Sequence, residues 1–142
     1  MSESVSTKLV FLEGYRFKVE FDVDSVANIV VDEMKPIGEG LGPNPTRLLS
    51  VSVAQCLSSS LLYYLGKARV KVKKLVTVVT ADIKRNDEGY FRVVRLAVQM
   101  HLEVDEEDKP RVPRCLSIFE NYCTVTQSIR SGIEVKVNTV FC

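Results

Sequence analysis

The longest apolar stretch of the chain runs from residue 44 to residue 68 and is NPTRLLSVSVAQCLSSSLLYYLGKA. Its apolar residues occupy every face of a helix instead of one stripe, which is typical of a helix buried nearly all round. The pattern predicts a helix over residues 46–67, roughly 33 Å long at a rise of 1.5 Å per residue. Asn44 is the predicted N-cap and Pro45 the first helical residue. We therefore expect a central helix around which the chain is organised.

Alternating apolar and polar residues before this helix predict antiparallel strands. Residues 9–12 and 15–22 flank Glu13-Gly14, and a two-residue connection with a glycine is typical of a β-hairpin. A third strand is expected over residues 27–31, followed by the loop 32–45 with its three glycines and three prolines. Arg16 falls on the solvent-facing side of the hairpin. The side chains expected to face the core are Tyr15, Phe17, Val19 and Phe21.

A second pair of strands is predicted after the helix. Residues 75–84 and 91–104 are separated by Asn-Asp-Glu-Gly at positions 86–89, a strong turn signal. His101 falls on the more polar face of the second strand, which favours a surface histidine over a ligand or a base. The residues of that strand expected to face the core are Val94, Leu96, Val98, Met100, Leu102 and Val104.

The last part of the chain predicts helical segments and a closing strand. A helix is expected over residues 113–122 because it begins at a proline and carries apolar residues at helical spacing. Thr124 and Gln127 match a capping box for the next helix, and Gly132 offers its C-terminal stop. Residues 133–140 alternate between apolar and polar side chains, so the chain is expected to end in a strand. Together these elements predict an α+β fold.

The composition narrows the function classes without changing this outline. A chain of 142 residues with 46% hydrophobic and 26% charged residues fits one folded domain over residues 1–142. A formal net charge of +1 gives no reason to expect nucleic acid as a partner. The first nine residues carry charges of both signs and no apolar core, so we expect no secretory signal and a cytoplasmic protein.

Three other site types find little support in the sequence. A membrane span competes as an explanation for residues 44–68, but five serines and Gln55 dilute the run, so no membrane partner is expected. The glycines of residues 38–42 stand between a strand and a helix, yet they do not match the spacing of a nucleotide-binding loop. With His101 as the one histidine and no C-x-x-C pair among four cysteines, neither a metal site nor a disulfide scaffold is expected.

Two of the four cysteines occupy positions suited to thiol chemistry. Cys123 stands just before a predicted helix N-terminus, whose free N–H groups and positive dipole end would lower its pKa. Cys56 lies about ten residues inside the long helix, where burial would raise its pKa, so it needs an outside cation to react. Local physics therefore makes Cys123 the more acidic candidate. Cys115 and Cys142 are expected to be buried small hydrophobes.

Two phrases carry a family resemblance that extends over nearly the whole chain. The first is GLGPNPTRLLSVSVAQCLSSSLLYYL, with a G-P-x-P turn and Cys56, and the second is FENYCTVTQSIRSGIEVKV, with Cys123 and a closing G-I-x-V strand. Both resemble the OsmC/Ohr family, the osmotically inducible and organic hydroperoxide resistance proteins. The resemblance implies an OsmC-like α+β fold, with antiparallel sheets wrapped around a long buried central helix in an intertwined homodimer.

The resemblance also implies a function. In the family, the cysteine on the central helix attacks a hydroperoxide, and the second cysteine resolves the resulting sulfenic acid as a disulfide. Cys56 and Cys123 match these two positions, which reverses the ranking from local physics. The implied activity is a thiol-dependent peroxidase of the oxidative stress response, acting on organic hydroperoxides or hydrogen peroxide. An external dithiol would be the reductant, and no metal or organic cofactor is expected.

Two departures from the family pattern leave a second function open. Family peroxidases use an arginine to stabilise the attacking thiolate and a glutamate, right after the second proline of the turn, to hold that arginine. Thr46 stands at the place of the glutamate, and residues 32–44 contain no arginine. Arg16, Lys35 and Arg47 are therefore the candidate cations. The alternative is a catalytically weak or inactive family member that binds a small apolar ligand or a partner in the dimer cleft.

Overall fold

A computed structural model of the protein describes residues 2–142. The chain divides into two units, one that ends at Leu49 and one that extends over Ser50–Cys142. Helix α1 (Pro45–Lys67) begins in the N-terminal unit and continues through the C-terminal unit, and its bounds confirm the predicted central helix. The α+β class with antiparallel sheets is confirmed as well. The single domain over residues 1–142 stays a prediction.

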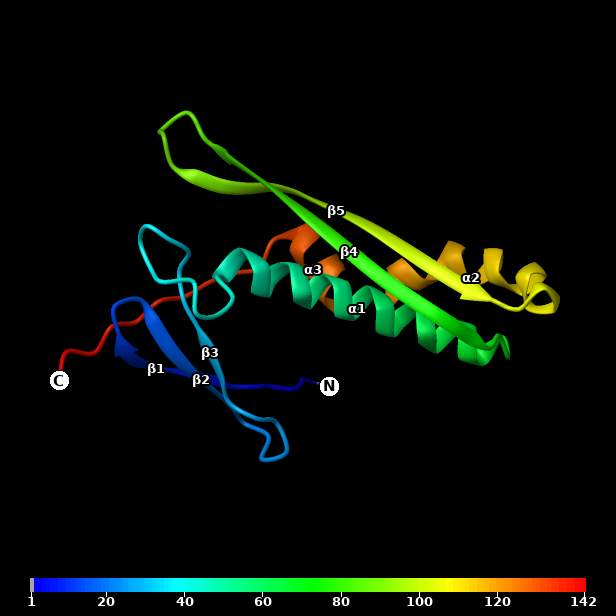
Figure 1. The fold of residues 1–142 in the computed structure, drawn as a ribbon, viewed down its shortest axis with the longest axis horizontal. Helices are drawn as coiled ribbons and strands as arrows, with labels where there is room; N and C mark the ends of the chain where they lie inside the picture. Colours follow the sequence, from blue (N-terminus) through cyan, green and yellow to red (C-terminus); the bar gives the residue numbers. More distant parts are fainter. Residues whose placement is uncertain (1) are drawn as a thin grey trace. The chain divides into compact units, whose positions relative to one another are not determined.

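The N-terminal unit contains a three-stranded antiparallel sheet in the order β1-β2-β3 (Figure 1). Its strands are β1 (Thr7–Glu13), β2 (Arg16–Phe21) and β3 (Ile29–Val31), which confirms the predicted hairpin and places the third strand two residues later than expected. The turn residues are Gly14, with φ of +58°, and Tyr15. Tyr15 is therefore 54% exposed, and its predicted place in the core is wrong.

The loop after β3 is organised by one buried carboxylate, Asp32. Its oxygens accept the backbone N–H groups of Glu33, Glu39 and Leu41 at 2.8, 3.2 and 3.2 Å. Burial works to raise the pKa of Asp32, but these three donors outweigh it, and the pKa lies below its ordinary value. A Cβ at Gly38 would lie 2.2 Å from the Glu33 oxygen, so this turn requires glycine. The amides of the glycine-rich loop thus bind the loop's own carboxylate, which weakens the nucleotide-site alternative.

The C-terminal unit packs α1 against a two-stranded antiparallel ribbon and a chain of short helices. The ribbon consists of β4 (Val72–Arg85) and β5 (Phe91–Val104), joined at the predicted turn (Figure 1). The short elements are the 3-10 helix η1 (Glu106–Arg111), α2 (Val112–Ile118), the 3-10 helix η2 (Phe119–Tyr122) and α3 (Thr124–Ser131). The core of this unit comprises Val53, Leu57, Leu61, Leu65, Val70, Cys115, Phe119 and Cys123.

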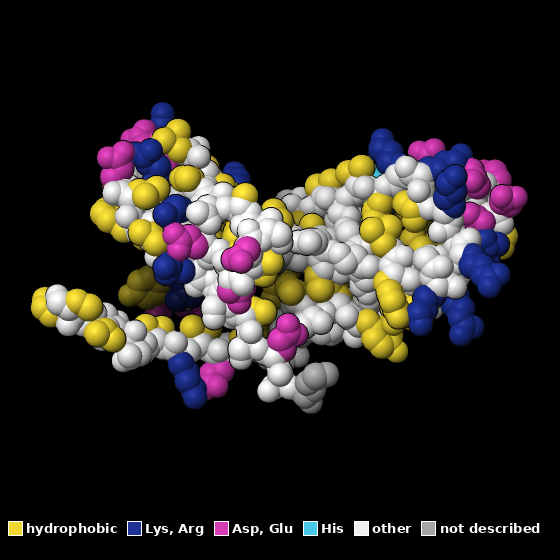
Figure 2. Space-filling view, turned by 90° about the horizontal axis from the view of Figure 1, so that it is seen from below, with side chains coloured by type: hydrophobic (Ala, Val, Ile, Leu, Met, Phe, Trp, Pro, Cys, Tyr) yellow, Lys and Arg dark blue, Asp and Glu magenta, His cyan; other side chains and the backbone are white. Residues whose placement is uncertain are grey.

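Helix α1 buries one stripe, not its whole circumference. Its fully buried residues, Val53, Leu57, Leu61 and Leu65, recur every fourth position and face the core. Other apolar residues of the helix remain exposed, with Leu62 at 45%, and apolar side chains are visible at the surface of the chain in Figure 2. The expected burial on all sides is therefore wrong for the single chain, because the ribbon and the short helices cover only one side of α1.

By length and composition, α1 would also be able to cross a membrane. Core helices of globular proteins can be equally long and apolar. The stripe of α1 that is packed in the core of the C-terminal unit fits this second explanation.

The chain after η2 differs from its prediction in two ways. Cys123, with extended backbone angles, is the N-cap of α3, and no side-chain capping bond forms, so the capping box of Thr124 and Gln127 is wrong. The Gln127 amide donates to the Glu120 carbonyl instead. Residues 133–140 form no strand and are exposed, so the predicted closing strand is wrong for the single chain, in which this segment pairs with neither sheet. Gly132, with φ of +78°, ends α3 as predicted.

Candidate functional site

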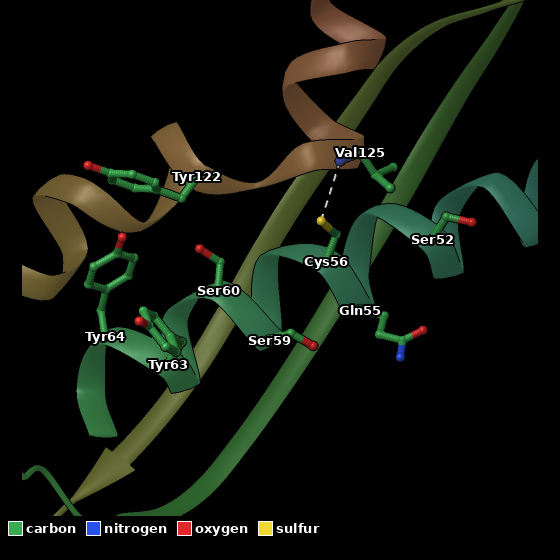
Figure 3. A pocket seen from close by; sticks show the side chains of 9 residues that line it. All are labelled: Ser52, Gln55, Cys56, Ser59, Ser60, Tyr63, Tyr64, Tyr122 and Val125. Carbon is green, nitrogen blue, oxygen red and sulfur yellow. Dashed lines mark hydrogen bonds between the residues drawn. The ribbon is translucent and has the colours of Figure 1, made fainter. Parts of the chain in front are cut away.

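Cys56 lies beside an open cavity of about 850 Å³ in the C-terminal unit. The residue is half-buried, and Figure 3 shows its sulfur pointing away from α1 toward the start of α3. Within residues 2–142, no acidic or basic side chain lines this cavity. Its lining consists of Ser52, Gln55, Cys56, Ser59, Ser60, Tyr63, Tyr64, Tyr122 and Val125. An uncharged, hydroxyl-rich cavity with a single thiol suits a neutral substrate.

The backbone at the start of α3 donates a hydrogen bond to this thiol. The Val125 N–H lies 3.4 Å from the Cys56 sulfur, the contact drawn as a dashed line in Figure 3. Val125 is the second residue of α3, so its N–H has no partner within the helix and carries part of the positive end of the dipole. The helix terminus that the sequence associates with Cys123 is therefore directed at Cys56.

The pKa of Cys56 is nevertheless raised above its ordinary value. Burial is the largest cause, and the neighbouring Cys123 thiol adds to it. The backbone N–H groups of Val125 and Thr126 act in the opposite direction without balancing these two effects. The sequence-based expectation that burial raises this pKa agrees with the structure. A positive charge near the sulfur would favour the thiolate and act against burial.

Cys123 is a buried neighbour of Cys56. It is 1% exposed, and its thiol donates a hydrogen bond to the Thr126 hydroxyl at 3.0 Å. Both cysteines are free thiols. Cys123 does not line the cavity: Cys56 faces the cavity, whereas Cys123 lies in the core of the C-terminal unit. The effect of Cys123 on the pKa of Cys56 still requires the two thiols to be close.

The candidate cations belong to the N-terminal unit. Arg16 forms an ion pair with Glu13, and its positive charge contributes to lowering the pKa of Asp32, after the backbone donors. Arg47 donates to the Asn44 side chain at 3.2 Å. Each arginine thus has a local partner.

Sequence reasoning missed a cluster of three tyrosines at one end of the cavity. The rings of Tyr63 and Tyr64 are 5.2 Å apart and meet edge to face, and Tyr64 lies 5.3 Å from Tyr122. Burial, followed by the neighbouring Tyr122 and Tyr63, raises the pKa of Tyr64. Tyr63 follows Cys56 by seven residues, two helical turns, so helical spacing could have placed it on the same face. Tyr122 and Thr126 stand beside Cys123 in the second phrase of the family resemblance, but no spacing rule gives either of them a role in the site.

The remaining thiols are outside this site. Cys115 is buried, as expected, and its thiol donates to backbone carbonyl groups. Cys142 is exposed, so its expected burial is wrong. In the described part of the chain, no group of three or more His, Cys, Asp or Glu side chains could hold a metal ion.

Comparisons with known proteins agree on one fold. A family model described as OsmC-like protein matches residues 38–138. An OsmC-like protein of unknown function from Vibrio cholerae superposes with a TM-score of 0.76 at 14% identity, over 90% of this chain and 94% of that chain. The OsmC-like protein from Mycoplasma pneumoniae gives 0.74 at 16% identity, over 92% and 89%. An organic hydroperoxide resistance protein from Elizabethkingia anophelis gives 0.67 at 20% identity, over 96% and 94%. None of the curated proteins matches the chain.

Proposed function

Because the chain belongs to the OsmC-like protein family, we propose that it is a thiol-dependent peroxidase that reduces organic hydroperoxides or hydrogen peroxide. A peroxide-related role at the level of the family is supported by relatives that are named organic hydroperoxide resistance proteins. The observation that carries the proposal for this chain is the pairing of a cavity-facing thiol, hydrogen-bonded by the Val125 N–H, with the buried Cys123 thiol beside it.

In the first step, the Cys56 thiolate attacks the peroxide. Its sulfur takes the terminal oxygen of ROOH, the O–O bond breaks, and the alkoxide leaves as ROH after taking up a proton. Cys56 becomes a sulfenic acid. The amides at the start of α3 favour the thiolate over the thiol, and they stay directed at the sulfur throughout this step.

In the second step, Cys123 resolves the sulfenic acid. The Cys123 thiol condenses with the Cys56 sulfenic acid, a disulfide forms, and water leaves. An external dithiol then reduces the disulfide and returns both thiols. The cycle requires no metal or organic cofactor. A cytoplasmic location, also part of this proposal, would supply such dithiols.

We assign the activating charge to Arg16. A cation near the sulfur favours the thiolate and would offset the effect of burial on the pKa of Cys56. The cavity at Cys56 has no cationic lining residue of its own within the described chain, so the charge has to come from another part of the chain or from a second copy. Among the candidates, Arg16 already acts electrostatically on a buried acid, Asp32.

A homodimer completes the proposal. The face of α1 opposite its buried stripe carries exposed apolar residues, and small residues recur there at positions 52, 59 and 66, which allows close approach of a second helix. Residues 133–140 offer an exposed alternating segment that a strand edge of another copy would pair. Sedimentation analysis should give twice the 16.0 kDa mass of the chain. A monomeric wild-type protein would contradict the homodimer.

The decisive experiment is the replacement of Cys56 by serine. Peroxide consumption is measured with an organic hydroperoxide and dithiothreitol as the electron donor, and Cys142→Ser, which changes an exposed thiol, is the matched control. We expect Cys56→Ser to reduce the rate by more than about a hundredfold, because the nucleophile is gone. Wild-type turnover by Cys56→Ser would end the peroxidase proposal.

A second function stays open because the pKa of Cys56 is raised and its cavity is uncharged. A family member with an idle thiol would bind a small apolar ligand or a partner at this place instead. Mass spectrometry after mild peroxide treatment separates the two functions. Rapid and selective formation of the Cys56–Cys123 disulfide supports the peroxidase, whereas slow oxidation of all four thiols supports the binding protein.

A further inference from the structure

We propose that Thr126 is the positioning residue of the resolving step: its hydroxyl holds the Cys123 thiol in the orientation from which the sulfur attacks oxidised Cys56. This inference rests on the proposed function. It adds a side chain that takes no part in peroxide binding and whose hydroxyl acts through Cys123.

The geometry places Thr126 directly against Cys123. The thiol donates to the Thr126 hydroxyl at 3.0 Å, and the two residues are 1% and 7% exposed. Cys123 is the N-cap of α3 and Thr126 is its third residue, so the bond spans the first turn of the helix. Both side chains are buried, and the hydrogen bond fixes the direction of the S–H group.

The first turn of α3 treats the two sulfurs differently. Cys56 accepts the Val125 N–H at 3.4 Å, and the Thr126 amide also favours its ionised form. Cys123 is a donor, to the Thr126 side chain. The turn therefore donates to the sulfur that the proposed function makes the nucleophile and accepts from the sulfur that it makes the resolving thiol.

Resolution of the sulfenic acid by Cys123 releases one molecule of water. The Cys123 sulfur forms a bond with the Cys56 sulfur, the S–O bond of the sulfenic acid breaks, and the Cys123 proton joins the leaving hydroxide as water. The Cys123 sulfur is oxidised and the sulfenic sulfur is reduced. With its S–H bond directed at Thr126, Cys123 can turn a lone pair toward Cys56.

The test compares two substitutions of the same residue. Thr126→Val keeps the shape of the side chain and loses the hydroxyl, whereas Thr126→Ser keeps the hydroxyl and loses a methyl group. After mixing with an organic hydroperoxide and rapid acid quench, mass spectrometry follows two species: Cys56 sulfenic acid, trapped by a 1,3-diketone, and the Cys56–Cys123 disulfide. The readout is the rate of disulfide formation divided by the rate of Cys56 oxidation.

We expect this ratio to fall about fivefold in Thr126→Val, the effect of one hydrogen bond, with an accumulation of trapped sulfenic acid. In Thr126→Ser the ratio should stay near the wild-type value. An unchanged ratio in Thr126→Val, or an equal loss in both variants, would overturn the role of the hydroxyl while Cys56 oxidation still supports the peroxidase. If wild-type Cys56 formed neither species, the proposed function itself would fail, and the role of Thr126 with it.

Discussion

Two places in the chain direct backbone N–H groups at one acidic side chain, with opposite results. In the N-terminal unit, the Asp32 carboxylate accepts three such bonds of 2.8 to 3.2 Å, and its pKa is lowered although burial opposes this. In the C-terminal unit, Cys56 accepts the Val125 N–H at 3.4 Å, and its pKa is raised because burial and the Cys123 thiol prevail.

The difference lies in the number of close donors and in the presence of a full charge. Asp32 has three donors and also the field of Arg16, whereas the described lining of the Cys56 cavity contains no cation. Amides at a helix terminus carry only partial charges, and a sulfur atom is a weaker acceptor than a carboxylate oxygen. The comparison teaches that α3 positions Cys56 for chemistry but does not by itself ionise it.

Among the variants that test this comparison, the largest effect is expected from removing the proposed cation. In an Arg16→Gln variant, the pKa of Cys56 should stay above its ordinary value, because the proposed cation is gone. The thiolate fraction of Cys56, and with it the rate of alkylation by iodoacetamide, should then increase about tenfold per pH unit, or roughly a hundredfold between pH 6 and pH 8. At pH 7 the variant should react about tenfold more slowly than the wild type. Alkylation of Cys56 is followed by mass spectrometry in a Cys123→Ser background.

The matched variant for this measurement is Arg47→Gln, which changes the other arginine of the N-terminal unit. Its Cys56 should react like that of the wild type. Equal rates for Arg16→Gln and the wild type at pH 7 would break the assignment of Arg16, and a slow Arg47→Gln would transfer the role to Arg47.

A smaller effect is expected from weakening the other acidic site. Asp32→Asn keeps one acceptor oxygen but replaces the other with an amide that cannot accept, so the N–H groups of Glu39 and Leu41 should exchange with solvent about fivefold faster. Hydrogen exchange detected by NMR measures this directly. Unchanged protection of both amides in Asp32→Asn would show that the carboxylate does not organise the loop.

The pH dependence of the same protection has a definite sign. Because the pKa of Asp32 is lowered in the folded state, its contribution is complete above the ordinary carboxyl pKa and is lost as the pH falls through the lowered value. After correction for intrinsic exchange, wild-type protection of Leu41 should fall in that acid range. The protection in Asp32→Asn should lack this transition.

The smallest effect is expected at the ion pair between Glu13 and Arg16. The Glu13 side chain is 73% exposed, and exposed pairs contribute little, so Glu13→Gln should change the free energy of unfolding by less than about 0.5 kcal/mol. Urea denaturation measures this change. A loss of several kcal/mol in the free energy of unfolding would mean that the ion pair with Glu13, and not the negative charge of Asp32, holds the Arg16 side chain.

The sequence patterns identified most elements of the fold because local rules govern them. The hairpin of β1 and β2, the bounds of α1 and the long strand β5 follow from alternation and helical spacing. The closing strand over residues 133–140 did not form, since a strand requires a partner edge that its own pattern does not specify. The start of α3 was wrong by one residue, which is the usual uncertainty of a helix boundary.

For the site, the sequence alone marked Cys56 and Cys123, the first as a helix-interior thiol whose pKa burial would raise and the second as a thiol at a helix start. Only the tertiary structure decided which sulfur the N–H groups of α3 reach, because that depends on how α3 packs across α1. It also brought Thr126 to Cys123 and gathered three tyrosines beside the cavity. Composition and local spacing determine which side chains a helix presents, whereas the direction of a single N–H group is set by packing between elements distant in the chain.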